Sequence, residues 1–206
     1  MAARPEPWRS PAMRKAVRSA LGAVSIDEVA HLDLYSCFAS SLAFAKDALG
    51  IESERGLTVT GGLPYHGGPG SNYTTHALAA MTEVLRADPG SLGLVSGIGM
   101  HMTSHRAAVL STRPASFVAL GQPEVLPTVP VAREATGTAR VVTYSTVFTR
   151  EGPEWTALIC DLPDGSRSYA RLEEPAEDGD LTGGDDLAGG KVTLATDSRG
   201  VTRAQR

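Results

Sequence analysis

The sequence has 206 residues, 42% of them hydrophobic and 20% charged, which is ordinary for a globular protein with room for one large domain or two small ones. The net charge is −4 and the basic residues are scattered, so neither nucleic acid nor an anionic membrane is expected as a partner. With no apolar run of about 18 residues and no signal peptide, the sequence predicts a cytoplasmic protein.

Helical and strand-like patterns alternate through the first half of the chain. The sequence predicts helices at 11–21, 40–49 and 72–87, a capped turn at 25–28, and strands at 31–34, 57–60, 91–97 and 107–111. The order helix, strand, helix, strand, helix, strand, strand is typical of an α/β domain. Since ligands in α/β folds collect at the carboxyl ends of parallel strands, we expect a site in the loops that follow these strands.

The most informative stretch is 58–81, where a β-branched run leads into five glycines and two prolines and then into a helical period. Such a loop presents backbone N–H groups to an oxygen or a phosphate. It lacks the Gly-x-Gly-x-x-Gly and Gly-Lys-Ser/Thr patterns of nucleotide sites. A tight strand-to-helix turn with no chemistry is the alternative interpretation.

The string Gly-Gly-Leu-Pro-Tyr-His-Gly-Gly-Pro-Gly at 61–70 resembles the C-terminal half of the thiolase superfamily, in which a Gly-Gly-Leu stretch precedes a Gly-His-Pro loop and a helix. It is most similar to the branch related to sterol-carrier-protein-2 thiolases, often named acetyl-CoA acetyltransferases. The resemblance covers residues 1–112 and implies an α/β, C-terminal thiolase-like half domain. It also implies acyl transfer from a coenzyme A thioester, with no further cofactor and no metal.

In this family the acylated cysteine sits in the N-terminal half. The resemblance therefore implies that activity needs an oligomer or a partner chain that carries the N-terminal thiolase half. A non-catalytic subunit that binds CoA or acyl-CoA, or serves assembly, is the alternative, and a truncated product is a third.

Tyr35-Ser36-Cys37-Phe38 stands where this branch carries His-Asp-Cys-Phe, so the resemblance implies that Cys37 is the acid/base and that Tyr35 replaces an oxyanion-holding histidine. Cys37 could equally be a small buried hydrophobe. Gly67 and Gly68 align with the Gly-His-Pro loop, with Gly68 in place of its histidine. His66, two positions earlier, could reach the same space or be an exposed loop histidine.

The stretch Ser96-Gly97-Ile98-Gly99 corresponds to the family's Cys-x-Gly loop, without its cysteine. The amides of Gly97 and Gly99 could still form an oxyanion hole. Thr103-Ser104-His105 resembles a Thr-Lys-His stretch in the same branch, which implies a catalytic role for His105. A strand-start histidine bonded to the backbone is the alternative.

Prolines are dense over 113–130, which predicts a linker. Residues 131–206 then predict a small all-β domain with strands at 140–148, 154–162, 166–172 and 191–196. It resembles the OB-like module appended to some thiolase-like acyl-CoA proteins. An acidic stretch at 173–186 could suggest calcium, but its spacing does not fit an EF-hand, and a solvated loop is the alternative.

Cys37 and Cys160 are the two cysteines of the chain. They lie far apart, with no CxxC motif and no histidine at ligand spacing. Neither a disulfide framework nor a zinc site is expected. Any function of a thiol would be as a reactive group.

Overall fold

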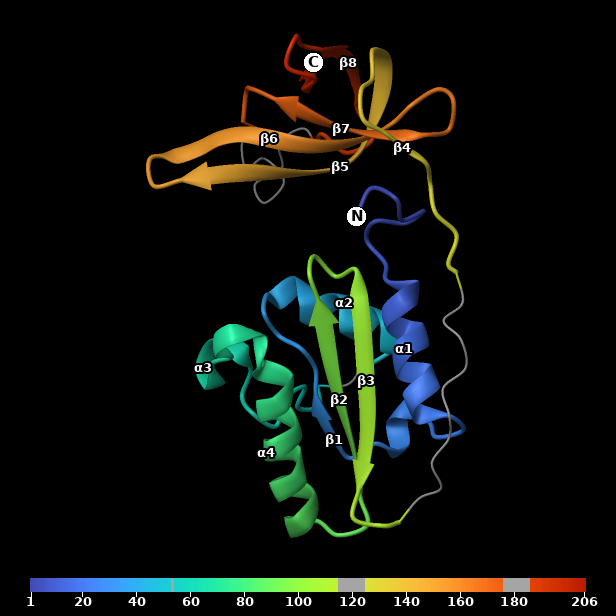
Figure 1. The fold of residues 1–206 in the computed structure, drawn as a ribbon, viewed down its shortest axis with the longest axis vertical. Helices are drawn as coiled ribbons and strands as arrows, with labels where there is room; N and C mark the ends of the chain where they lie inside the picture. Colours follow the sequence, from blue (N-terminus) through green and yellow to red (C-terminus); the bar gives the residue numbers. More distant parts are fainter. Residues whose placement is uncertain (53, 115–124, 176–185) are drawn as a thin grey trace. The chain divides into compact units, whose positions relative to one another are not determined.

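A computed structural model describes residues 1–52, 54–114, 125–175 and 186–206. The chain divides into two compact units, an α/β unit of Trp8–Leu126 and a β unit that combines Met1–Pro7 with Pro127–Arg206 (Figure 1). The chain passes from the α/β unit back into the β unit between Leu126 and Pro127, inside the predicted linker at 113–130. The first seven residues differ from the sequence-based assignment, which placed them in the α/β domain.

The α/β unit is built on a three-stranded mixed sheet with the order β1-β2-β3. Its strands are β1 (His31–Asp33), β2 (Leu92–Gly99) and β3 (Ser104–Ser111). β1 runs parallel to β2 with Asp33 opposite Val95, and β3 returns antiparallel to β2. The carboxyl ends of β1 and β2 therefore lie at the same edge of the sheet.

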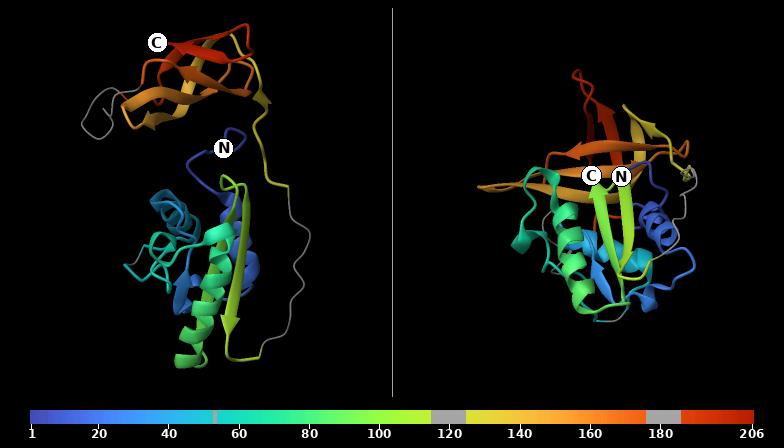
Figure 2. Two further views of the ribbon diagram at one scale, coloured as in Figure 1. Left: turned by 60° about the vertical axis from the view of Figure 1, so that its left-hand side comes forward. Right: turned by 60° about the horizontal axis from the view of Figure 1, so that its bottom comes forward.

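Helices cover both faces of this sheet (Figures 1 and 2). They are α1 (Pro11–Leu21), α2 (Ala39–Leu49) and α4 (Tyr73–Ala87). A short 3-10 helix, η1 (Ile26–Glu28), lies between α1 and β1 in the chain. α1 begins as predicted, because the Ser10 hydroxyl accepts a hydrogen bond from the Met13 N–H, and α2 ends as predicted at Gly50, whose φ is 67°. α1 and α2 pack with Leu94 on one face, and α4 packs with Val95 on the other.

The predicted strand at 57–60 does not form. The N–H of Leu34 donates to the carbonyl of Leu57, but the next amides turn to a side chain: Val59 and Thr60 both donate to the carboxylate of Asp33. A side chain thus takes the place of a neighbouring strand. The glycine loop that follows also contains short helices, α3 (Leu63–His66) and η2 (Pro69–Ser71), where the sequence predicts only a loop.

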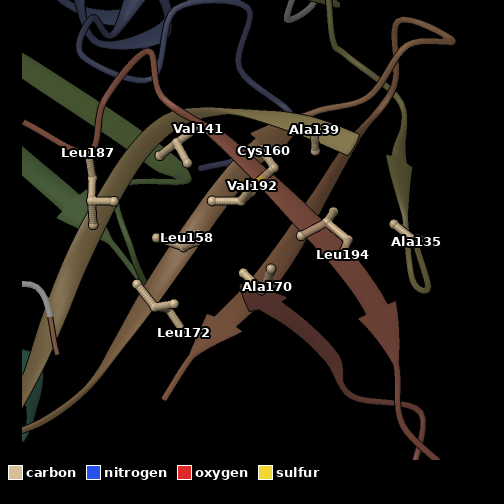
Figure 3. Packing of buried hydrophobic residues seen from close by; sticks show 11 residues of the cluster. Ala135, Ala139, Val141, Leu158, Cys160, Ala170, Leu172, Leu187, Val192 and Leu194 are labelled. Carbon is tan, nitrogen blue, oxygen red and sulfur yellow. The ribbon is translucent and has the colours of Figure 1, made fainter. Parts of the chain in front are cut away.

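The β unit is a six-stranded sheet in which β7 also pairs with β9. Its strands are β4 (Val131–Ala132), β5 (Gly137–Thr149), β6 (Gly152–Asp161), β7 (Arg167–Leu172), β8 (Lys191–Thr196) and β9 (Thr202–Gln205). The pairing makes a barrel-like ring of five strands, β5-β6-β7-β9-β8, with β4 beside the start of β7. Small and aliphatic side chains fill it, including Val141, Leu158 and Leu194 (Figure 3).

The first residues of the chain join the β unit through Arg167, a buried side chain at the start of β7. Its guanidinium donates to the carbonyls of Ala2, Arg4 and Pro5 and pairs with Asp161. The bonds to the three carbonyls link residues more than 160 positions apart, so no local pattern could predict them. They explain why Met1–Pro7 belongs to the β unit.

In the part of the chain that the structure describes, no helix is long and apolar enough to cross a membrane. Nor do three or more His, Cys, Asp or Glu side chains gather there as metal ligands would. Residues 176–185 of the acidic stretch lie outside the described residues. The calcium site and the solvated loop therefore both stay predictions from the sequence.

Candidate functional site

Three segments meet where β1 and β2 end. The N–H of Tyr35 donates to the hydroxyl of Ser96 on β2 at 3.1 Å. The N–H of Leu63, at the start of α3, donates to the hydroxyl of Ser36 at 2.9 Å. The loop after β1 is thus tied both to β2 and to the glycine-rich segment, as the expectation of a common sheet edge requires.

Cys37 lies in the loop after β1 and is partly exposed. Its Sγ is 3.2 Å from the hydroxyl of Ser41, on the first turn of α2. Burial, with a smaller contribution from the nearby Cys37, raises the pKa of Tyr35 above its usual value. The hydroxyl of Ser41 therefore contacts this thiol, and the pKa of Tyr35 keeps its phenol protonated at neutral pH.

Cys160 differs from Cys37 in its surroundings. It is fully buried in the core of the β unit. Burial, with a smaller contribution from the carboxylate of Asp161, raises its pKa to about 11. Cys160 is therefore a structural thiol, and it provides an internal reference for the reactivity of Cys37.

Tyr73, the first residue of α4, contacts both the end of β1 and the loop that carries Cys37. Its hydroxyl donates to Asp33 Oδ1 at 2.8 Å and lies 2.7 Å from the hydroxyl of Thr60. Its ring meets the ring of Tyr35 edge-on, with centroids 5.7 Å apart. Burial raises the pKa of Tyr73, against the lowering effect of hydrogen bonds with Thr60 and Ser36.

Two of the predicted glycines, Gly68 and Gly97, lie against the first turn of α4. Gly67 follows α3 with φ at 78°, and Gly68 packs so closely on Tyr73 that an added Cβ would lie 2.8 Å from the Cβ of Tyr73. Gly97 faces Thr74 in the same way, at 3.0 Å from its hydroxyl oxygen. Gly97 and Gly99 belong to β2 itself, so the strand extends to the end of the predicted oxyanion loop.

We predict that Gly68→Ala destabilises the α/β unit by about 1–3 kcal/mol, because the new methyl group overlaps the backbone-proximal atoms of Tyr73. The φ of Gly68, −164°, is open to any residue, so the cost is steric. Thermal unfolding measures it. Gly56→Ala is the matched control, since its added Cβ meets nothing within 4 Å, and an equal effect of both substitutions would contradict the prediction.

His66 lies exposed on α3, next to the predicted loop. Its ring contacts the ring of His76 on α4, with centroids 5.3 Å apart. His76 Nε2 is 3.2 Å from the side-chain amide of Asn72, and its Nδ1 is buried with no hydrogen-bond partner in the described part of the chain. The structure thus pairs the two histidines with each other.

His105 lies in β3 opposite Ile98, whose side chain packs with α1 and α2. Its Nε2 is 3.2 Å from the hydroxyl of Ser10, which caps α1. Directly opposed residues of an antiparallel pair share a face. Because Tyr35 packs with α4, His105 and Tyr35 lie on opposite faces of the sheet.

Sequence reasoning missed the polar residues that hold this site together. They are Asp33, Ser41, Thr60, Tyr73 and Ser96. Asp33 was the detectable one, because it is a carboxylate between Leu32 and Leu34 in a short strand-like run. The hydroxyl residues carried no signal, since serines, threonines and a tyrosine are ordinary at helix starts and strand ends.

Among solved structures, the chain is similar to a monomeric SCP2-thiolase-like protein type 1 from Mycobacterium smegmatis. The two are 32% identical and superpose with a TM-score of 0.86, over 99% of this chain and 47% of that one. No protein-family model and no curated protein matches the sequence. The thiolase-like fold expected from 61–70 is thereby confirmed, and the chain spans about half the length of this structural relative.

Proposed function

We propose that this chain acts as the C-terminal half of a thiolase-like acyl-CoA acyltransferase of the acetyl-CoA acetyltransferase type. The fold supports this assignment, as does the position of a partly exposed thiol where two parallel strands end. The observation that carries the proposal is the setting of Cys37, a partly exposed thiol in the loop after β1 with the Ser41 hydroxyl 3.2 Å from its sulfur.

The proposed ligand is the thioester end of an acyl-CoA, with no further cofactor. Hydroxyl groups are suitable donors to a thioester carbonyl, and a protonated Tyr35 can donate but cannot accept a proton. The acylated cysteine would come from an oligomer or from a partner chain that carries the N-terminal half.

The alternative is a non-catalytic subunit that binds CoA or acyl-CoA or serves assembly. One observation favours it. Gly68 replaces the loop histidine, and His66, two positions earlier in the chain, packs on His76. A site with donors but without a base would bind a thioester and leave it intact. Both versions share the binding site, and turnover in the presence of an N-terminal half distinguishes them.

For the β unit we propose an OB-like module. The closed order β5-β6-β7-β9-β8 supports this, because the OB fold is a five-stranded Greek-key barrel. We also propose a cytoplasmic location for the protein, because acyl-CoA would be available to it in that compartment.

We predict that CoA or acetyl-CoA slows alkylation of Cys37 and leaves alkylation of Cys160 unchanged. A thioester seated beside Tyr35 would cover the Cys37 sulfur, whereas Cys160 is buried in the β unit. Peptide mass mapping after a timed iodoacetamide pulse measures both rates in one sample. Equal protection of both thiols, or of neither, would remove the case for an acyl-CoA site and leave only the fold.

A further inference from the structure

Asp33 is a buried carboxylate that the proposed thioester chemistry does not use. It is 0% exposed at the end of β1. Its Oδ2 accepts from the N–H groups of Val59 and Thr60, at 3.1 and 3.0 Å, and from the Thr60 hydroxyl at 2.8 Å. Its Oδ1 accepts from the hydroxyl of Tyr73. A buried carboxylate is costly unless it is hydrogen-bonded, and four donors meet this requirement here.

These four bonds join parts of the unit that regular secondary structure leaves apart. They connect β1 to the segment at 57–60, which forms no strand, and to the first residue of α4. The hydroxyl of Thr60 also accepts the N–H of Gly62 at 3.2 Å, which carries the connection into the glycine loop. Asp33 thus supplies the attachment that a paired strand would otherwise provide.

The same cluster reaches Cys37 through two aromatic rings. Tyr73, held by Asp33, contacts the ring of Tyr35 edge-on. Tyr35 stands two residues before Cys37 in the loop after β1, and Ser36 between them accepts the N–H of Leu63 from the glycine loop. Direct contacts therefore run from a fully buried carboxylate to the two residues that precede the partly exposed thiol.

We propose that Asp33 is a positioning residue for the thiol site. It fixes Thr60 and Tyr73, and Tyr73 holds the ring of Tyr35 in the loop that carries Cys37. Without the carboxylate, two backbone N–H groups and two hydroxyls lose their acceptor, and the bond from the Leu34 N–H to the Leu57 carbonyl stays as the attachment of this segment next to β1. The inference rests on the proposed function only for the identity of the ligand, because positioning is measurable in the free protein.

The test is the rate of Cys37 alkylation by iodoacetamide in the full chain without CoA. Asp33→Asn removes the charge and, with its oxygen kept toward Val59 and Thr60, replaces the acceptor of the Tyr73 hydroxyl by an NH2 group, and Thr60→Val removes one hydroxyl at nearly constant volume. Each should raise the rate roughly tenfold, since losing a hydrogen bond to a charged group opens the site locally. Thr60→Ser keeps the hydroxyl and should restore the wild-type rate.

A purely structural role is separated by a variant that destabilises the same unit elsewhere. Val17→Ala opens a cavity in the core beside α1, away from the Asp33 cluster. At a temperature well below all melting points, Val17→Ala should leave Cys37 alkylation unchanged. Rates for Thr60→Val that equal either wild type or Val17→Ala would overturn the proposal, and this holds even where Asp33→Asn fails to fold.

The two proposals fail in different ways. If CoA does not protect Cys37 in the wild-type chain, the acyl-CoA site is wrong, while the effect of Thr60→Val on the free thiol still decides the role of Asp33. If CoA protects but Thr60→Val and Thr60→Ser react alike, the site stands and Asp33 does not position it.

Discussion

Arg167→Leu should destabilise the β unit by about 3 kcal/mol, because it removes the donor of several buried hydrogen bonds at once. The guanidinium serves the carbonyls of Ala2, Arg4 and Pro5, and its partner Asp161 stays half-exposed and solvated. A loss of this size corresponds to a roughly 100-fold larger population of the open unit. Alkylation of the buried Cys160 measures that opening directly.

Arg171→Leu is the matched control for this substitution. Arg171 lies four residues further along β7, pairs with Glu173 at the surface and stacks over Trp155 at 4.6 Å. Surface pairs and exposed cation–π contacts contribute about 1 kcal/mol or less, so Cys160 should stay protected.

Deleting residues 1–6 should reproduce the effect of Arg167→Leu, and the two changes together should not add. Both remove the same contacts from opposite sides. A truncated chain in which Cys160 reacts as slowly as in the full chain would show that the N-terminal segment is dispensable for the β unit. The assignment of these residues to that unit would then have no energetic meaning.

Local chemistry explains which elements the sequence predicts well. α1 is fixed by Ser10 before its first proline, and α2 by the left-handed Gly50 at its end, so their bounds follow from residues next to them in the chain. The long hairpin of β5 and β6 follows likewise from alternation around its turn at 150–151. Each of these signals lies within a few residues of the element it defines.

Long-range polar contacts explain what the sequence does not predict. The stretch at 57–60 has the composition of a strand, yet its amides bond to the Asp33 side chain, 26 and 27 positions away. Met1–Pro7 reads as an irregular lead-in because its partner, Arg167, is at the other end of the chain. The short β4 and β9 have too few residues to show a period, and pairing with β7 defines them.

The candidate site divides in the same way. Cys37 and the glycine loop could be found from the sequence, because each follows a strand-like run at a predicted sheet edge. The sequence could not predict that His66 would pack on His76. Nor could it predict that His105 would contact Ser10 on the face of the sheet opposite Tyr35. Those outcomes depend on which face each side chain takes after folding.

The purified chain alone should show no thiolysis of acetoacetyl-CoA above the uncatalysed background. Thiolysis needs a nucleophile that takes up the acyl group, which the thiolase family carries in its N-terminal half, and a base that activates this nucleophile, a step that typically contributes about 10²–10⁴-fold. The Cys37 thiol lies 3.2 Å from the hydroxyl of Ser41, and the raised pKa of Tyr35 keeps its phenol protonated at pH 7. Gly68 has no side chain to serve instead. A coupled assay of acetyl-CoA formation measures the rate.

Adding a separately produced N-terminal thiolase half is the decisive second arm of that assay. If the chain is half of an acyltransferase, turnover should appear with both parts present, should disappear with Cys37→Ala, and should survive Cys160→Ala, whose thiol lies in the core of the β unit. Protection of Cys37 by CoA without turnover in the mixture would favour the binding subunit. Thiolysis by the chain alone, lost with Cys37→Ala, would contradict the prediction, because it would mean that the chain acts without the nucleophile of the N-terminal half and without the loop histidine that Gly68 replaces.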